Sequence, residues 1–243
     1  MNIEEHLTEE HEQSPISEYM REIAYGGLDG IITTFAIVAG FAGAEAPQAV
    51  TQLTAVPVLL FGFANLCADG LSMGLSNFLS LRSEKDQYRA EKEKERQKIY
   101  RSPHLELKET IAILIAKGYK KADAQTMAKL YAKNKPYWTD FMMNQELKMS
   151  NPEHKSIVGT SLATFFSFVL FGLIPLVPYF VVSPSASSFI HSITATGAAL
   201  LLLGLLRWKI IKEGGVRSVA ETLLLGTVAA STAYLVGTFF RAA

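Results

Sequence analysis

The sequence has a single cysteine, Cys67, and no excess of either charge. One cysteine excludes a disulfide framework and any cysteine-rich metal site. Because Lys and Arg number 23 and Asp and Glu also number 23, the chain lacks the net positive charge with which proteins bind nucleic-acid phosphates. There is no Gly-x-Ser-x-Gly, Walker or dinucleotide-binding motif, and no Glu-x-x-His pair of the kind that di-iron oxidases use. These absences argue against a nucleic-acid-binding protein, a nucleotide-driven pump and a di-iron oxidase.

The charges that are present lie in two parts of the chain. Residues 82–155 hold 17 of the Lys and Arg residues and 11 of the acids, and the first 22 residues hold seven more acids. The remainder consists mainly of long apolar stretches, each close to the ~17–25 residues that a helix needs to cross a bilayer. A single soluble globule is therefore excluded, and the acidic N-terminus does not resemble a signal peptide. The five stretches are residues 23–44, 53–79, 157–182, 189–206 and 219–240.

The distribution of Lys and Arg predicts the orientation. Residues 46–52 and 183–188 contain neither, whereas residues 82–155 and 207–217 are rich in both. Since basic loops stay in the cytoplasm, we expect the N-terminus and the long polar segment there and the C-terminus outside.

The fold class predicted is all-α: a polytopic membrane protein with five transmembrane helices and a helical cytoplasmic insert between the second and third. We expect three regions. They are residues 1–79 with the first two transmembrane helices, residues 80–155 as the metal-binding insert, and residues 156–243 with the last three helices.

Helix signals divide the insert. No stop signal follows the second apolar stretch, so that helix should continue to about residue 99. Ser102 and Pro103 then predict a helix start, and Gly118 predicts its end. Two further helices are expected at about residues 122–134 and 137–149.

Three acids lie inside the apolar stretches, namely Asp29, Asp69 and Glu221. Charged groups are costly there and usually mark function. Glu22 and Glu18 precede Asp29 by 7 and 11 residues, so the three carboxylates share one helix face and resemble a path for a cation or proton. Glu18 and Glu22 fit equally well as solvated acids of a first helical turn.

Asn65, Asp69 and Met73 follow one another at four-residue spacing on the second stretch. Amide, carboxylate and thioether ligands together suit a borderline metal such as Fe²⁺ or Mn²⁺. Met73 by itself is more typical of core packing.

The insert carries a second group of acids and thioethers at in-phase helical spacing. Three helices that bring these faces together would form a carboxylate pocket for divalent metal ions. The alternative is a solvated face whose acids pair with the interleaved lysines and arginines. The candidate ligands are Glu84, Glu91, Glu95, Glu106, Glu109, Met142, Glu146 and Met149.

Two long motifs resemble the vacuolar iron transporter family, in a prokaryotic-type form. The run from Arg21 to Ala36, REIAYGGLDGIITTFA, resembles its first helix, and the run from Ala68 to Met73, ADGLSM, resembles part of its second. Pro103, the glutamates of the insert, Pro175 and Pro178 also match. The resemblance covers about residues 18–240.

This resemblance implies a five-helix homodimer that exports Fe²⁺, and often Mn²⁺, from the cytosol in exchange for protons. The metal would pass between the first and second helices of the dimer, using Asp29 and Met73, with Glu18 and Glu22 at the cytoplasmic entrance. The insert would collect metal on Glu91, Glu95, Glu106, Glu109 and Glu146, with Met142 or Met149 nearby. No prosthetic group is implied. The expected partners are divalent metal ions, protons, membrane lipid and a second copy of the chain, and the expected membrane is a prokaryotic plasma membrane, or a vacuolar-type one in a eukaryote.

Two other functions are open at this point. A membrane-anchored metal sensor or buffer would use the insert alone, but an anchor has no use for acids inside its helices. A membrane-embedded enzyme could use Asp29 and Asp69 as an acid–base pair, although no nucleophile, cofactor motif or histidine partner accompanies them.

Overall fold

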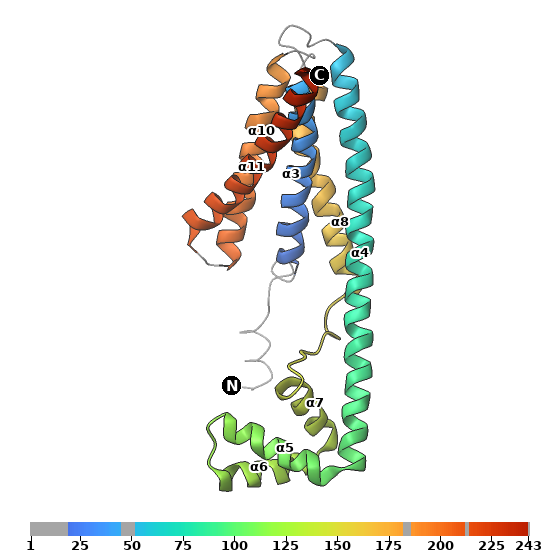
Figure 1. Cartoon of the computed structure of the whole chain (residues 1–243), viewed down its shortest axis with the longest axis vertical. Helices are drawn as coiled ribbons and strands as arrows, with labels where there is room; N and C mark the ends of the chain where they lie inside the picture. The colour runs from blue at the N-terminus through green and yellow to red at the C-terminus, as the bar shows by residue number, and fades with distance from the viewer. Residues whose placement is uncertain (1–18, 45–51, 182–185, 212–213, 243) are drawn as a thin grey trace, which may run out of the picture. The chain divides into compact units, whose positions relative to one another are not determined.

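The computed structural model describes residues 19–44, 52–181, 186–211 and 214–242, and all regular structure within these ranges is helical (Figure 1). The all-α prediction is confirmed. Five helices have the length and apolar composition to cross a membrane, as the five apolar stretches predict. The chain divides into two compact units: a transmembrane unit of residues 1–78 and 158–243, and an insert of residues 79–157.

The transmembrane unit is a bundle of long helices. Its elements are α3 (Met20–Ala44), the first part of α4 (Gln52–Arg101), α8 (Ile157–Leu173), a 3₁₀ turn (Ile174–Leu176), α9 (Val177–Val181), α10 (Ala186–Ile211) and α11 (Gly215–Ala242). The third expected span is therefore interrupted. Pro175 and Pro178 lack the N–H groups that a continuous helix would use, and the chain changes to a 3₁₀ turn there.

Helix α3 packs against α10 and α11 and lies beside them in Figure 1. Small residues allow the backbones to approach closely, which is how membrane helices gain packing energy without a hydrophobic driving force. A Cβ atom added at Gly30 would overlap the carbonyl oxygen of Phe168 on α8, and one added at Gly237 of α11 would overlap that of Gly40 on α3. Apolar side chains fill the remaining space, notably Phe168, which is fully buried.

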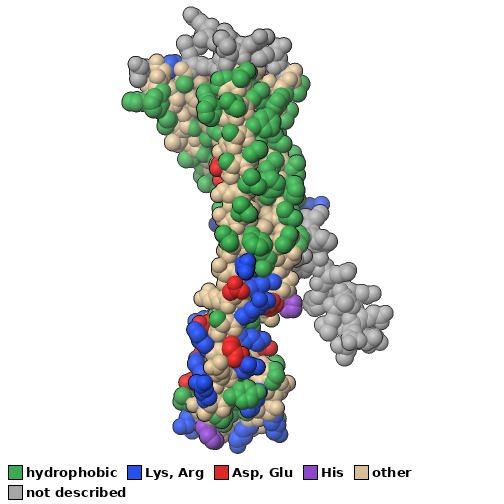
Figure 2. Space-filling view, turned by 90° about the vertical axis from the view of Figure 1, so that its right-hand side faces the viewer, with side chains coloured by type: hydrophobic (Ala, Val, Ile, Leu, Met, Phe, Trp, Pro, Cys, Tyr) green, Lys and Arg blue, Asp and Glu red, His purple; other side chains and the backbone are tan. Residues whose placement is uncertain are grey.

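The outer surface of the transmembrane unit is apolar, and Figure 2 shows hydrophobic side chains spread over it, with charged side chains gathered on the insert. Leu60, Leu71 and Leu75 along α4 are each more than half exposed. Such a surface fits a hydrocarbon environment better than water.

The insert consists of the second part of α4 together with α5 (Pro103–Ala116), α6 (Lys121–Lys133) and α7 (Lys135–Gln145). The continuous second helix and the helix after Pro103 match the prediction, and Gly118 adopts the left-handed conformation, with a φ of +100°, just after α5. A small core of Ile99, Trp138 and Met142 joins α4 to α7.

The predicted end of the last insert helix at residue 149 is wrong. Helix α7 ends at Gln145, and Lys148 takes the left-handed conformation with a φ of 54°. The amide of Met149 donates to the carbonyl of Met143 over 3.0 Å, so the chain folds back on the last turn of α7. Met149 therefore lies beyond the helix and does not continue the face of Met142 and Glu146.

Candidate metal centre

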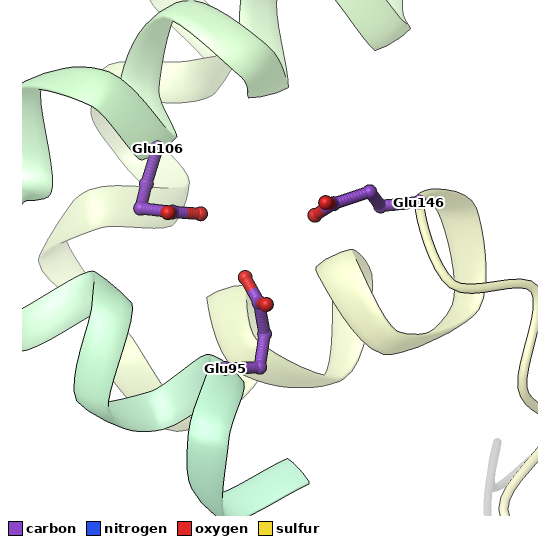
Figure 3. Close-up of side chains that lie close together, drawn as sticks. All are labelled: Glu95, Glu106 and Glu146. Atoms are coloured by element: carbon purple, nitrogen blue, oxygen red, sulfur yellow. The ribbon is translucent and has the colours of Figure 1, made fainter. Parts of the chain in front are cut away.

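Three glutamates of the insert converge on one point (Figure 3). Glu95 comes from α4, Glu106 from the first turn of α5, and Glu146 from the residue that caps α7. One carboxylate oxygen from each lies within 4.8 Å of the others. Carboxylates gathered at this separation offer an oxygen-rich site for a divalent cation.

A buried polar contact holds two of the contributing helices together. The hydroxyl of Thr110 on α5 donates a hydrogen bond to the backbone carbonyl of Glu106, one turn earlier, over 2.8 Å. The indole N–H of Trp138 on α7 donates to the same hydroxyl over 2.7 Å, and the sulfur of Met142 lies 3.4 Å from it. These contacts fix α5 against α7 and so set the positions of Glu106 and Glu146.

Two of the three glutamates are buried to an unusual degree for acids, and the third, Glu146, is half-buried. Glu95 is 1% exposed and Glu106 is 2% exposed. Each of the three has a buried carboxylate oxygen that finds no hydrogen-bond donor in the described part of the chain. A buried oxygen without a donor is costly, and a cation coordinated by all three would remove that cost.

The electrostatics of the cluster favour bound protons when no cation is present. Burial, then hydrogen bonding and charge interaction with Glu95, raise the pKa of Glu106 to about 7. Burial and the charge of Glu95 also raise the pKa of Glu146. Protons and a divalent cation therefore compete for the same oxygens.

One basic side chain already contacts the cluster. The ammonium group of Lys98, one turn after Glu95 on α4, lies 3.0 Å from a carboxylate oxygen of Glu95. The lysine side chain is half exposed and lies on the cavity side of the cluster. A cavity of about 350 Å³ opens beside the glutamates and is lined by Lys98, Glu106, Glu109 and Glu146 among others.

The other candidate ligands of the insert lie in different surroundings. Glu109 lines the cavity without belonging to the three-glutamate cluster, and the sulfur of Met142 is directed to Thr110. Glu91 pairs with Lys94 at 2.7 Å, while Glu84 is exposed. The structure thus selects three members of the larger set that helical spacing had suggested.

The intramembrane acids form part of a second polar cluster, within the transmembrane unit. Asp29 on α3 is half-buried and close enough to Asp69 on α4 for their charges to interact. Asn65 donates to the hydroxyl of Thr33 over 3.4 Å, and Thr33 donates to the carbonyl of Asp29 over 2.8 Å. Sequence reasoning missed Thr33, although its position four residues after Asp29 was an available signal.

Asn65 and Asp69 also line a groove of about 780 Å³ bounded by α3, α4 and α11. Its other walls are apolar, including Phe41 and Phe61, whose rings lie 5.7 Å apart. An exposed carboxylate in an apolar groove of a membrane helix is costly to leave without a cation, a proton or a partner.

The remaining predicted positions are placed as follows. Glu22 is 7% exposed, with its carboxylate 3.4 Å from the guanidinium of Arg21. Met73 packs against the apolar core of the bundle, as expected for a core methionine. Glu221 pairs with Arg217 at 2.8 Å, and Glu18 lies outside the described residues.

Comparison with known proteins gives consistent matches over nearly the whole chain. The model of the VIT family matches residues 20–238. The chain is 31% identical over 232 residues to vacuolar iron transporter 1 of Tulipa gesneriana, covering 95% of this chain and 91% of the relative. It is 31% identical over 230 residues to vacuolar iron transporter 1 of Arabidopsis thaliana, covering 95% and 88%. It is 32% identical over 247 residues to the vacuolar iron transporter of Toxoplasma gondii, covering 97% and 80%.

Proposed function

Because the chain belongs to the VIT family, whose members are transporters and not enzymes, we propose that this multi-pass membrane protein exports Fe²⁺ from the cytoplasm in exchange for protons. Transport of metal ions follows from the family. The choice of iron rests on the relatives, which are named as iron transporters. Mn²⁺ is a second cargo in this proposal, since it prefers similar oxygen ligands.

The observation that supports metal capture most directly is the buried glutamate cluster. Glu95, Glu106 and Glu146 each have a buried oxygen without a donor among the described residues, so the cluster is incomplete without a proton or a cation. We assign the insert the task of collecting Fe²⁺ on the cytoplasmic side, which is also where its many basic residues predict it to lie.

The second polar cluster gives the proposal its path through the membrane. Asp29 and Asp69 would take the metal from Glu22 and Glu18, with Met73 adjoining the path. The groove beside Asp69 lies along α3 and α4, the helices that we propose to face the same helices of a second protomer. A homodimer would cover the groove and create a site lined by carboxylates from both copies.

Exchange with protons follows from the ligand chemistry. A carboxylate binds metal in its deprotonated form, so metal binding releases protons and protonation releases metal. An acidic compartment on the far side would therefore favour unloading at Asp29 and Asp69, and each returning transporter would carry protons inward.

The test is anaerobic Fe²⁺ uptake into proteoliposomes of the purified protein, with and without an inside-acidic pH gradient. We expect the gradient to stimulate uptake, and Asp29→Asn to reduce it at least about tenfold, since an intramembrane carboxylate ligand is lost. Glu84→Gln is the matched control, because Glu84 is exposed and outside both clusters. Gradient-stimulated uptake that is unchanged in Asp29→Asn would refute this path.

The same experiment separates the transporter from a membrane-anchored sensor or buffer. A sensor would bind Fe²⁺ at the insert, yet show no flux in proteoliposomes. The intramembrane Asp29 and Asp69 favour the transporter, because a sensor that uses only the insert does not require them. The host membrane in this proposal is a prokaryotic plasma membrane, or a vacuolar-type membrane in a eukaryote.

A further inference from the structure

The cavity beside the glutamate cluster has a basic wall as well as an acidic one. Lys94, Lys98 and Arg101 are spaced by four and three residues on the last two turns of α4, so they share one face of the helix. All three line the cavity that also contains Glu106, Glu109 and Glu146. A site for a bare cation alone has no need of a cationic wall.

Two of these bases differ from ordinary surface residues in their pairing. Lys98 contacts Glu95, a member of the cluster, at 3.0 Å. Arg101 has no ion-pair partner among the residues that the structure describes. Lys94 is held by Glu91 at 2.7 Å, so it adds positive charge at the rim without reaching the cluster.

A metal ion in the cluster would make the electrostatic environment of the Lys98 ammonium group unfavourable, whereas it is favourable now. A divalent cation bound to Glu95 would lie next to the ammonium group that Glu95 now holds, and the two positive charges would repel each other. An anion between the metal and Lys98 would turn that repulsion into two attractions. Arg101, three residues further along the same face, presents a fork of donors suited to carboxylate or phosphate oxygens.

The coordination number also leaves room for such an anion. Three glutamates supply three oxygens when each binds through one, whereas Fe²⁺ and Mn²⁺ in oxygen sites commonly take about six ligands. The cavity of about 350 Å³ lies within the range of about 300–1,000 Å³ that is typical of small-ligand sites. The open positions of the metal and the basic wall therefore meet in one space of suitable size.

We propose that the insert binds its metal together with a small polyanionic chelator that offers carboxylate or phosphate oxygens. The metal binds Glu95, Glu106 and Glu146, while the chelator fills open metal positions and places its remaining oxygens on Lys98 and Arg101. This inference rests on the proposed metal site and specifies the form in which the insert holds its metal: together with a bound chelator, not coordinated by protein and water alone.

The test measures anion retention directly. Purified full-length protein in detergent is dialysed to equilibrium against radiolabelled citrate or radiolabelled phosphate, anaerobically, with and without Fe²⁺, and bound iron and bound label are both counted. We expect about one label per protomer when Fe²⁺ is present and at least about tenfold less when it is absent. Retention of citrate alone identifies a carboxylate chelator, and retention of phosphate alone identifies a phosphate.

The variants separate the anion from the metal. At saturating Fe²⁺, Arg101→Gln should still bind iron through the three glutamates but retain about tenfold less label. Arg101→Lys should recover part of that loss, and Lys129→Gln should behave as wild type. Arg101 and Lys129 are both exposed, so neither change should disturb folding, and Lys129 lies on α6 away from the cavity.

The outcomes distinguish this inference from the proposed function. Iron bound without label, or label retained equally by Arg101→Gln, would overturn the chelate inference and leave the metal site standing. Glu106→Gln should lose both iron and label. Failure of the wild-type protein to bind iron would overturn the metal site itself, and the chelate inference with it.

Discussion

Trp138 donates its indole hydrogen to the hydroxyl of Thr110 over 2.7 Å, and both side chains are buried in the insert. The bond joins α7 to α5 one turn away from Glu106. It therefore couples the hydrogen-bonded core of the insert to the geometry of the carboxylate cluster.

Thr110→Val should destabilise the packing of α5 on α7 by about 1–3 kcal/mol, because it leaves the buried indole N–H without an acceptor. Hydrogen exchange of the full-length protein, read by mass spectrometry, should be faster in both helices. The variant should also bind Fe²⁺ more weakly in an anaerobic binding measurement. Thr110→Ser keeps the hydroxyl and should retain most of the protection. Equal exchange in the valine and serine variants would contradict the role assigned to this bond.

Glu106→Gln should weaken anaerobic Fe²⁺ binding by at least about tenfold. The amide keeps the size of the side chain but loses its charge, and even groups behind the metal ligands are commonly worth about 10–100-fold in affinity. Glu91→Gln is the matched control. Glu91 is an acid on the same helix as Glu95, but it pairs with Lys94 and does not belong to the cluster. Equal losses in the two variants would mean that the metal is held along the acidic surface and not by the buried cluster.

Without metal, the insert should become less stable as the pH rises. The pKa of Glu106 is raised to about 7 in the folded protein, against an ordinary value of 4.5. Between these values the folded protein holds a proton that the unfolded chain has released, so the free energy of unfolding falls as the pH rises from about 4.5 to about 7. Exchange protection of α5, corrected for intrinsic rates, should therefore be greater at pH 5.5 than at pH 7.5.

Two controls identify the group responsible for this pH dependence. Glu106→Gln cannot titrate, so its protection should vary much less with pH. Saturating Fe²⁺ at pH 7.5 should restore protection in the wild-type protein, because the cation replaces the proton among the same oxygens. A pH dependence that persists unchanged in Glu106→Gln would assign the effect to another group.

Gly237→Ala should disrupt the crossing of α3 and α11, whereas Gly40→Ala should be tolerated. The added methyl at Gly237 would overlap the carbonyl oxygen of Gly40, but a methyl at Gly40 would lie 3.7 Å from the carbonyl oxygen of Ala233, an ordinary contact. Overpacking typically costs about 1–3 kcal/mol, so thermal unfolding in detergent should occur at a lower temperature only for Gly237→Ala. Similar midpoints for both variants would show that the helices can separate at little cost.

Much of this fold follows from the sequence because membrane helices obey simple constraints of length and charge. The continuous α4 was predictable since no Gly or Pro interrupts residues 80–101, and the start of α5 was marked by Ser102 and Pro103. The end of α7 was not predictable in this way. Lys148 adopts a left-handed conformation that glycine usually takes, so the sequence contained no ordinary stop signal.

The sequence predicted the larger group of acids from which the candidate site is drawn, but not which three of them converge. Helical spacing placed Glu84, Glu91 and Glu95 on one broad face, but only the rotation of α4 against its neighbours decides which of them is buried. Glu95 meets α5 and α7, while Glu84 remains exposed. Tertiary contacts of this kind, including the acceptor role of Thr110, have no periodic signature in the chain.

The position of Glu146 at the end of α7 bears on how quickly bound metal is released. Glu95 and Glu106 lie within helices, whereas Glu146 comes just after the last residue of α7 and two residues before the left-handed Lys148. Its carboxylate can leave the metal through a few bond rotations, without unwinding a helix. We expect dissociation to begin at this ligand, which would give the insert a short residence time, so that it loads cargo without becoming a trap for it.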